Sequence, residues 1–135
     1  MRNENGNLII GLCGSTIGAR KEALRLLTES LTDVKDVTIP GNVRATWRRG
    51  DALTEQLEEF DGTDGNGVAI AMITCREEAE AIHEMEGIII HVEGNPSDDV
   101  SIERHHLLLT FKEESRGRYT TLADTLVKLG EQPTD

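Results

Sequence analysis

The stretch LIIGLCGSTIGARKEALRLLTESL, residues 8–31, decides the fold. Its opening run, residues 8–13, is almost wholly apolar, as expected of a strand that is covered on both faces. Glycines space out the turn that follows. Leucines then recur at i, i+3 and i+7 from Leu24, which predicts a helix over residues 18–32. A strand, a glycine-rich turn and a helix form the layout in which backbone N–H groups and a helix N-terminus face an anion.

The turn departs from the phosphate-binding pattern G-x-x-x-x-G-K-[ST] at its end. From Gly14 the chain reads G-S-T-I-G-A-R-K, so Ala19 replaces the second glycine and Arg20 replaces the lysine. Lys21 stands where the pattern has the hydroxyl that binds Mg²⁺. Arg20 can still pair with phosphate in a bidentate fashion. The candidate phosphate- or nucleotide-binding residues are Gly14, Ser15, Thr16, Gly18, Arg20 and Lys21.

Apolar runs and helical patterns alternate along the rest of the chain. Further strands are predicted over residues 37–39, 68–74, 88–92 and 107–111, and further helices over residues 51–60, 76–86 and 121–130. This alternation predicts an α/β fold, a three-layer αβα arrangement with a five-stranded parallel sheet. We expect a single domain over residues 1–135, with flexible ends at residues 1–7 and 131–135. Ligands of such sheets bind at the carboxyl ends of the strands.

The composition narrows the classes of partner. The formal net charge is −11, from 25 acidic and 14 basic residues, which argues against direct binding to nucleic acid. The polar start of the chain predicts no secretory signal, and no apolar run is long enough to predict a membrane helix. The two cysteines show neither a disulfide nor a zinc pattern. We therefore expect a cytoplasmic protein, whose oligomeric state the sequence leaves open.

Several other residues invite a functional and a plain structural interpretation. Segment 42–50 is predicted to be irregular and basic, and its Trp47 either stacks on a base or plugs the edge of the core. Cys13 and Cys75 end strands that we expect to be neighbours, so their thiols are either close or simply buried. The glutamates of residues 77–86 form either a solvated helix face or a docking face for a basic partner. Adjacent His105 and His106 point to opposite faces of a strand, which argues against a shared metal.

Three segments of the chain resemble the deoxynucleoside monophosphate kinases of bacteriophages, a P-loop family. IIGLCGSTIGARKEA, residues 9–23, is similar to the first strand and Walker A loop of that family. ITCREEAEAIHEMEGIIIHVEG, residues 73–94, resembles a second family segment, with Arg76 on its arginine and Thr74 on its aspartate. HLLLTF and TLADTLVKLG are similar to its last strand and closing helix. The middle, residues 34–67, matches poorly and looks trimmed.

The resemblance implies a P-loop kinase-like fold and places an acceptor-nucleotide site at Arg48, Arg49 and Arg76. It also implies that the lysine, the Mg²⁺-binding hydroxyl and the metal-side aspartate have all been replaced. Phosphoryl transfer depends on those groups, so we expect a phage-encoded pseudoenzyme in the host cytoplasm that binds a protein partner or a nucleotide. One alternative is an active nucleoside monophosphate kinase that uses Arg20 with ATP and Mg²⁺. The other alternative is a protein that sequesters a nucleotide. Outside the kinase alternative, no cofactor or metal is indicated.

Overall fold

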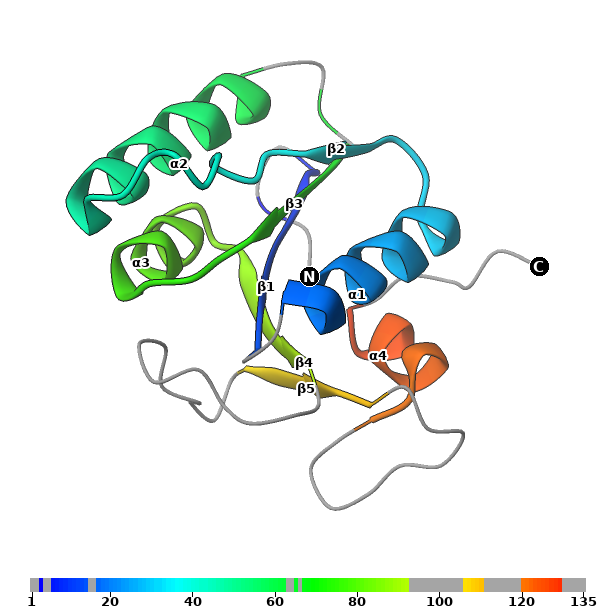
Figure 1. The fold of residues 1–135 in the computed structure, drawn as a ribbon. Helices are drawn as coiled ribbons and strands as arrows, with labels where there is room; N and C mark the ends of the chain where they lie inside the picture. Colours follow the sequence, from blue (N-terminus) through cyan, green and yellow to red (C-terminus); the bar gives the residue numbers. More distant parts are fainter. Residues whose placement is uncertain are drawn as a thin grey trace.

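The computed structural model describes residues 3, 6–14, 17–62, 65, 67–92, 106–110 and 120–129. Strands and helices alternate over most of this part of the chain (Figure 1). The elements are β1 (Leu8–Cys13), α1 (Ile17–Ser30), β2 (Val34–Asp36), α2 (Thr46–Asp61), β3 (Val68–Met72), α3 (Arg76–Glu84), β4 (Ile88–Val92), β5 (Leu107–Leu109) and α4 (Leu122–Lys128).

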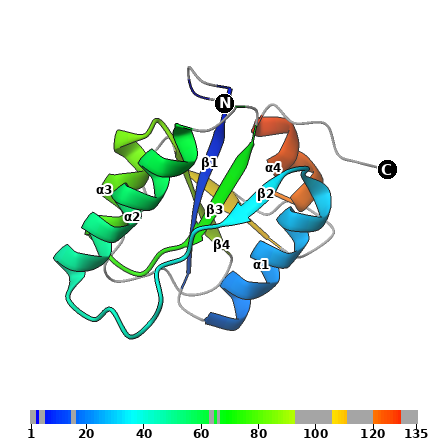
Figure 2. The same cartoon turned by 90° about the horizontal axis from the view of Figure 1, so that it is seen from above.

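The strands form one parallel five-stranded sheet in the order β2-β3-β1-β4-β5. Helices α1 and α4 cover one face of this sheet, and α2 and α3 cover the other (Figures 1 and 2). The prediction of an α/β fold with a five-stranded parallel sheet between two helical layers is confirmed. Because β1 and β3 are neighbours whose following helices lie on opposite faces, the chain diverges at their carboxyl ends.

Alternation along β1 explains the two halves of the core. Leu8, Ile10 and Leu12 pack with α1 and α4, whereas Ile9 and Cys13 pack with α2 and α3. All residues of β1 are buried, as its continuous apolar run predicts. Gly11 lies inside this strand, where an added Cβ would come within 3.0 Å of side-chain atoms of Ile82 and Ile89. The absence of a side chain at Gly11 therefore lets α3 approach the sheet.

Two predicted elements, the second strand and the second helix, are displaced by more than two residues from their observed positions. The second strand is β2 at Val34–Asp36, and the predicted strand residues Val37 and Ile39 follow it as buried extended chain. Helix α2 begins at Thr46 instead of residue 51, although no side chain caps its start. The predicted irregular segment 42–50 therefore ends in a helix. Arg48 and Arg49 both lie on this helix, and successive residues of a helix point in different directions. Arg49 therefore faces the core and Arg48 faces outward.

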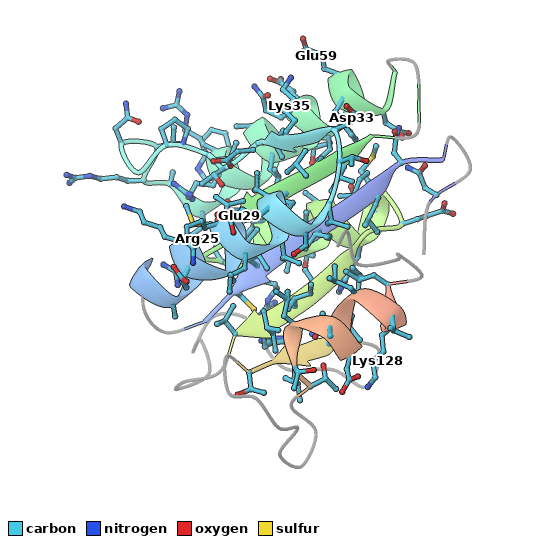
Figure 3. All side chains as sticks on the ribbon, turned by 90° about the vertical axis from the view of Figure 1, so that its right-hand side faces the viewer. Arg25, Glu29, Asp33, Lys35, Glu59 and Lys128 are labelled. Atoms are coloured by element: carbon cyan, nitrogen blue, oxygen red, sulfur yellow. The ribbon has the colours of Figure 1, made fainter. Side chains whose placement is uncertain are left out.

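The outer face of α1 carries an ion-pair ladder. The guanidinium of Arg25 bonds the carboxylate of Glu22 one turn before it and that of Glu29 one turn after it. Figure 3 shows Arg25 and Glu29 beside each other on this helix. Such exposed pairs add little to stability. None of the helices in the described part of the chain is long and apolar enough to cross a membrane.

Candidate functional site

A pocket of about 510 Å³ lies at the carboxyl edge of the sheet, beside the point where the chain diverges after β1 and β3. Parallel α/β sheets bind ligands at such places. The residues that line the pocket come from α1, from the segment after β2, from α2 and from the end of β3. They are Arg20, Thr38, Ile39, Pro40, Gly41, Val43, Arg44, Arg49, Met72 and Thr74.

Arg20 is the predicted phosphate-binding residue that reaches this pocket. It lies in the first turn of α1, and its Nη1 donates a hydrogen bond to the carbonyl oxygen of Gly14. Its Nε is buried and has no hydrogen-bond partner among the described residues. A buried guanidinium N–H without an acceptor is unfavourable. An acceptor that reaches this N–H would relieve that cost.

Arg49 also lines the pocket, but its donors are already used inside the protein. Its side chain is buried and pairs with Glu78 of α3, with 3.1 Å between Arg49 Nε and Glu78 Oε1. Its terminal nitrogens donate to the carbonyl oxygens of Ile39, Pro40 and Val43 at 2.9–3.0 Å. Arg49 therefore holds the pocket wall in place. Its contacts do not support the prediction that it is an acceptor-site cation.

Glu78 is the carboxylate that accepts hydrogen bonds from Arg49. It is fully buried, and its Oε1 accepts hydrogen bonds from Thr74 N and Thr74 Oγ1 at 3.0 Å. The thiol of Cys75 lies 3.3 Å from the same oxygen. Glu78 thus fixes the turn between β3 and α3, while Arg49 fixes the segment after β2. One ion pair holds both walls of the pocket.

The remaining predicted site residues divide into several groups. Gly18 and Lys21 are exposed on α1, and Lys21 does not line the pocket. Arg48 lies over the ring of Trp47, with its Cζ 6.0 Å from the ring centroid, and Arg76 is exposed at the start of α3. These positions do not assemble the predicted acceptor site around the pocket. Ser15 and Thr16 lie outside the described residues.

Trp47 is 65% exposed, so the interpretation that it plugs the core edge is wrong. Arg44, an exposed arginine of the basic segment 42–50, lines the pocket together with Arg20. Arg44 belongs to the segment that the sequence marked as basic, but nothing in the pattern distinguished it from Arg48.

The chemistry of the lining side chains suits an organic anion. Arg20 and Arg44 line the pocket beside the internally paired Arg49, and Ile39, Val43 and Met72 supply apolar wall. No acidic side chain is among the lining residues in the described part of the chain. The hydroxyl of Thr74 already donates to Glu78, so the lining side chains do not fit a Mg²⁺ ion, which prefers carboxylate oxygens.

A second polar cluster lies on the α3 side of the sheet. The described residues bring His83, His91 and His106 together in hydrogen-bonding contact, with Cys13 beside His91. The spacing of these three histidines along the chain does not predict this contact. His105 lies outside the described residues. Within the described residues, no three His, Cys, Asp or Glu side chains are arranged to hold one metal ion.

Both cysteines are buried and free. Burial raises the pKa of the Cys13 thiol to about 12, although the charge of Arg20 acts in the opposite direction. Burial also raises the pKa of Cys75 to about 11. Cys13 contacts His91 and Cys75 contacts Glu78, so each thiol belongs to a different hydrogen-bonded group. The interpretation of both cysteines as small buried side chains is confirmed.

The spacing of Glu78 in the sequence distinguishes it from the other glutamates of α3. The acidic run of residues 77–86 was interpreted as one solvated or docking face. Glu78, however, shares the i, i+3, i+4, i+7 spacing of Cys75, Ala79 and Ile82, which are buried. The same spacing places the carboxylate on the inner face of α3. An inward carboxylate requires a cationic partner, and Arg49 near the start of α2 supplies it.

The chain has no significant match to any protein-family model, to any curated protein or to any solved structure.

Proposed function

We propose that this protein binds a phosphorylated small molecule of mononucleotide size, without transferring its phosphoryl group. The ligand's phosphate lies against Arg20 and Arg44, and its apolar and aromatic part lies against Ile39, Val43 and Met72. The observation that carries the proposal is the pairing of two arginines with an apolar wall in one pocket of about 510 Å³. That volume is within the usual range for small-molecule sites.

The orphaned Nε of Arg20 gives independent support. A protein of net charge −11 repels anions at long range, so local donors must compensate. The buried Nε of Arg20 has no acceptor among the described residues. A phosphate oxygen supplies one, in a charge-assisted hydrogen bond that is stronger than a neutral one.

The same proposal treats the chain as a degenerate, phage-encoded relative of deoxynucleoside monophosphate kinases. The support is the sequence resemblance of residues 9–23 and 73–94, together with the replaced lysine and hydroxyl at Arg20 and Lys21. The lining side chains offer no carboxylate for Mg²⁺. Binding or sequestration of a nucleotide therefore fits these residues better than kinase activity. Free cysteines are typical of the cytoplasm, where the proposal places the protein.

One observation favours a second candidate, the binding of a protein partner. The guanidinium of Arg20 is hydrogen-bonded to the carbonyl oxygen of Gly14, so the protein's own side chain partly fills the turn after β1. A scaffold that acts through its surface has no need of an open anion site. If this candidate holds, Arg20 stabilises the turn and the pocket binds no phosphate.

Isothermal titration calorimetry of the full chain with dGMP, dTMP and ATP, with and without Mg²⁺, separates these candidates. The proposal expects binding that Mg²⁺ does not strengthen. Arg20→Gln should weaken it by about 10- to 100-fold, because a hydrogen bond to a charged group contributes about 1.5–3 kcal/mol. Arg25→Gln is the matched control, since Arg25 is on the same helix but pairs with Glu22 and Glu29 on its outer face.

Each other outcome has a definite meaning. Binding that requires Mg²⁺, followed by phosphoryl transfer in a turnover assay, would establish the kinase alternative with Arg20 in place of the lysine. No heat with any of the three nucleotides would reject the proposal in favour of the protein partner. Equal losses in Arg20→Gln and Arg25→Gln would place the ligand outside the pocket.

A further inference from the structure

Cys13, His91, His106 and His83 form one line of hydrogen bonds, here called the Cys–His line. Cys13 Sγ, at the end of β1, lies 2.9 Å from Nδ1 of His91 on β4. His91 Nε2 lies 2.8 Å from Nδ1 of His106, the residue before β5. His106 Nε2 lies 3.1 Å from Nε2 of His83 on α3. The line connects the fully buried Cys13 to the half-buried His83.

The contacts fix the positions of the protons. Each contact needs one proton between its two heavy atoms, and a neutral imidazole carries one N–H. If the Cys13 thiol donates to His91, then His91 must carry its proton on Nε2 and His106 must do the same. In the other arrangement every donor is reversed, and His91 Nδ1–H points at the sulfur. With neutral rings, no third arrangement fills every contact, so the tautomers of the rings are not independent.

An added proton changes the role of the cysteine. While the thiol donates, each ring nitrogen in the line is already either a donor or an acceptor. An extra proton on an acceptor nitrogen would point at the hydrogen of the neighbouring donor. If Cys13 instead accepts from His91 Nδ1, one extra proton fits on any of the three rings with all contacts kept. A second extra proton always breaks a contact.

We infer that the Cys–His line is a proton-sensitive switch: it takes up one proton as a unit, and that uptake converts Cys13 from hydrogen-bond donor to hydrogen-bond acceptor. The same geometry allows the rings to receive the thiol's own proton. That transfer leaves a thiolate hydrogen-bonded to His91 and an imidazolium elsewhere in the line, with no net change in protons. The inference does not depend on the proposed function.

Two charged side chains, Glu80 and Arg20, lie near the two ends of the line. Glu80 lies one helical turn before His83 on α3, and a carboxylate at that spacing stabilises an imidazolium. At the other end, the charge of Arg20 lowers the pKa of Cys13 against the larger effect of burial.

The experiment is an NMR titration of the full-length protein labelled with ¹⁵N in its histidine rings, between about pH 8 and pH 5 around the usual histidine pKa. Long-range ¹H–¹⁵N correlations distinguish the protonated nitrogen of each ring. At high pH we expect His91 and His106 both as Nε2–H tautomers. As one proton enters, His91 Nδ1 should become protonated at the same midpoint at which His83 and His106 shift.

Two substitutions at Cys13 test the coupling to the sulfur. Cys13→Ser keeps a group that donates and accepts, so the shared midpoint should stay within a few tenths of a pH unit. Cys13→Ala removes the sulfur that accepts from His91 Nδ1–H in the protonated state, so the midpoint should fall by about one pH unit, read at His83. Cys75→Ala is the matched control, because Cys75 is equally a buried thiol but contacts Glu78.

The unmodified protein alone can overturn the inference. Separate midpoints for the rings, or His91 already protonated on Nδ1 at high pH, would show that the line does not switch as a unit. An unchanged His83 midpoint in a folded Cys13→Ala protein would show that the sulfur is not coupled to α3. A shift of the same size in Cys75→Ala would assign the effect to general loosening of the core instead.

Discussion

Arg49 of α2 and Glu78 of α3 form a buried ion pair that holds the two walls of the pocket together, with 3.1 Å between Nε and Oε1. Glu78 is fully buried and Arg49 is 8% exposed. Buried pairs of this kind are rarely net stabilisers, but removing one partner leaves a charge without compensation. The pair therefore explains how a short, irregular segment after β2 keeps a defined shape.

Glu78→Gln should lower the free energy of unfolding by about 3 kcal/mol, because it leaves the Arg49 guanidinium buried without a counter-charge. Urea denaturation followed by circular dichroism measures this. Glu80→Gln, an exposed change of the same kind on the same helix, should stay within about 0.5 kcal/mol. Equal stabilities for the two variants would mean that Arg49 finds other acceptors and that the pair does not hold the walls.

Two helical glycines should respond to alanine in opposite directions. A Cβ at Gly50 of α2 would lie 2.7 Å from Glu77 Cβ, so Gly50→Ala should destabilise the fold by about 1–2 kcal/mol through overpacking of α2 against α3. A Cβ at Gly18 of α1 meets nothing within 4 Å, so Gly18→Ala should stabilise it by up to about 1 kcal/mol. Thermal unfolding measures both effects.

A stabilised Gly50→Ala protein would contradict the close approach of the two helices. A destabilised Gly18→Ala protein would show that this glycine serves the turn before α1, as its place in the degenerate phosphate-binding pattern first suggested.

The sequence predicts the fold class because the buried strands are continuous apolar runs. Residues 8–13 predict β1 to the residue, since a strand covered on both faces has no polar positions to blur its ends. The short edge strand β2 was misplaced, because Val34–Asp36 is largely exposed and lacks that signal. The start of α2 was missed for a related reason, since no capping side chain marks Thr46.

The candidate site was predicted less completely, because it depends on which side chains turn inward. Arg20 was identified from its place in the turn. Arg48 and Arg49 are adjacent arginines in the sequence, but they point in different directions from α2. Arg49 is buried against Glu78, whereas Arg48 lies over the ring of Trp47. The contact between His83 and His106 joins α3 to the residue before β5. No local pattern encodes such a tertiary contact.

The buried thiols should make the protein sensitive to alkali. Folding raises the pKa of Cys13 to about 12 and that of Cys75 to about 11, from an unfolded value of 9.0. A raised pKa means that the folded state holds the proton longer, so its stabilising effect is complete below pH 9 and is lost as the pH rises through the folded pKa values. The free energy of unfolding should fall by at most about 1.4 kcal/mol per pH unit for each thiol.

Denaturation curves between about pH 8 and pH 11, a window that brackets the usual thiol pKa, check this slope. A protein with serine at both positions supplies the reference, because serine does not titrate there, and its curve should be flatter by the predicted amount. Parallel curves would mean that the folded thiols titrate normally. Slow modification of the native protein by iodoacetamide at pH near 8, with rapid modification once unfolded, would independently agree with two protonated, buried thiols.

Arg44 should contribute to ligand affinity mainly through its charge. It lines the pocket with Arg20 but is exposed, so its attraction for a phosphate is screened by salt. Arg44→Gln should weaken the binding of a nucleoside monophosphate by only about 2- to 5-fold at low ionic strength, as for other exposed ion pairs, and the loss should shrink as salt is added. Calorimetric titrations at two salt concentrations measure both effects, with Arg48→Gln as the matched control on the neighbouring α2. The corresponding nucleoside, which lacks the phosphate, should not bind measurably. A nucleoside that binds as well as its monophosphate would show that the apolar wall alone holds the ligand and that neither arginine recognises a phosphate.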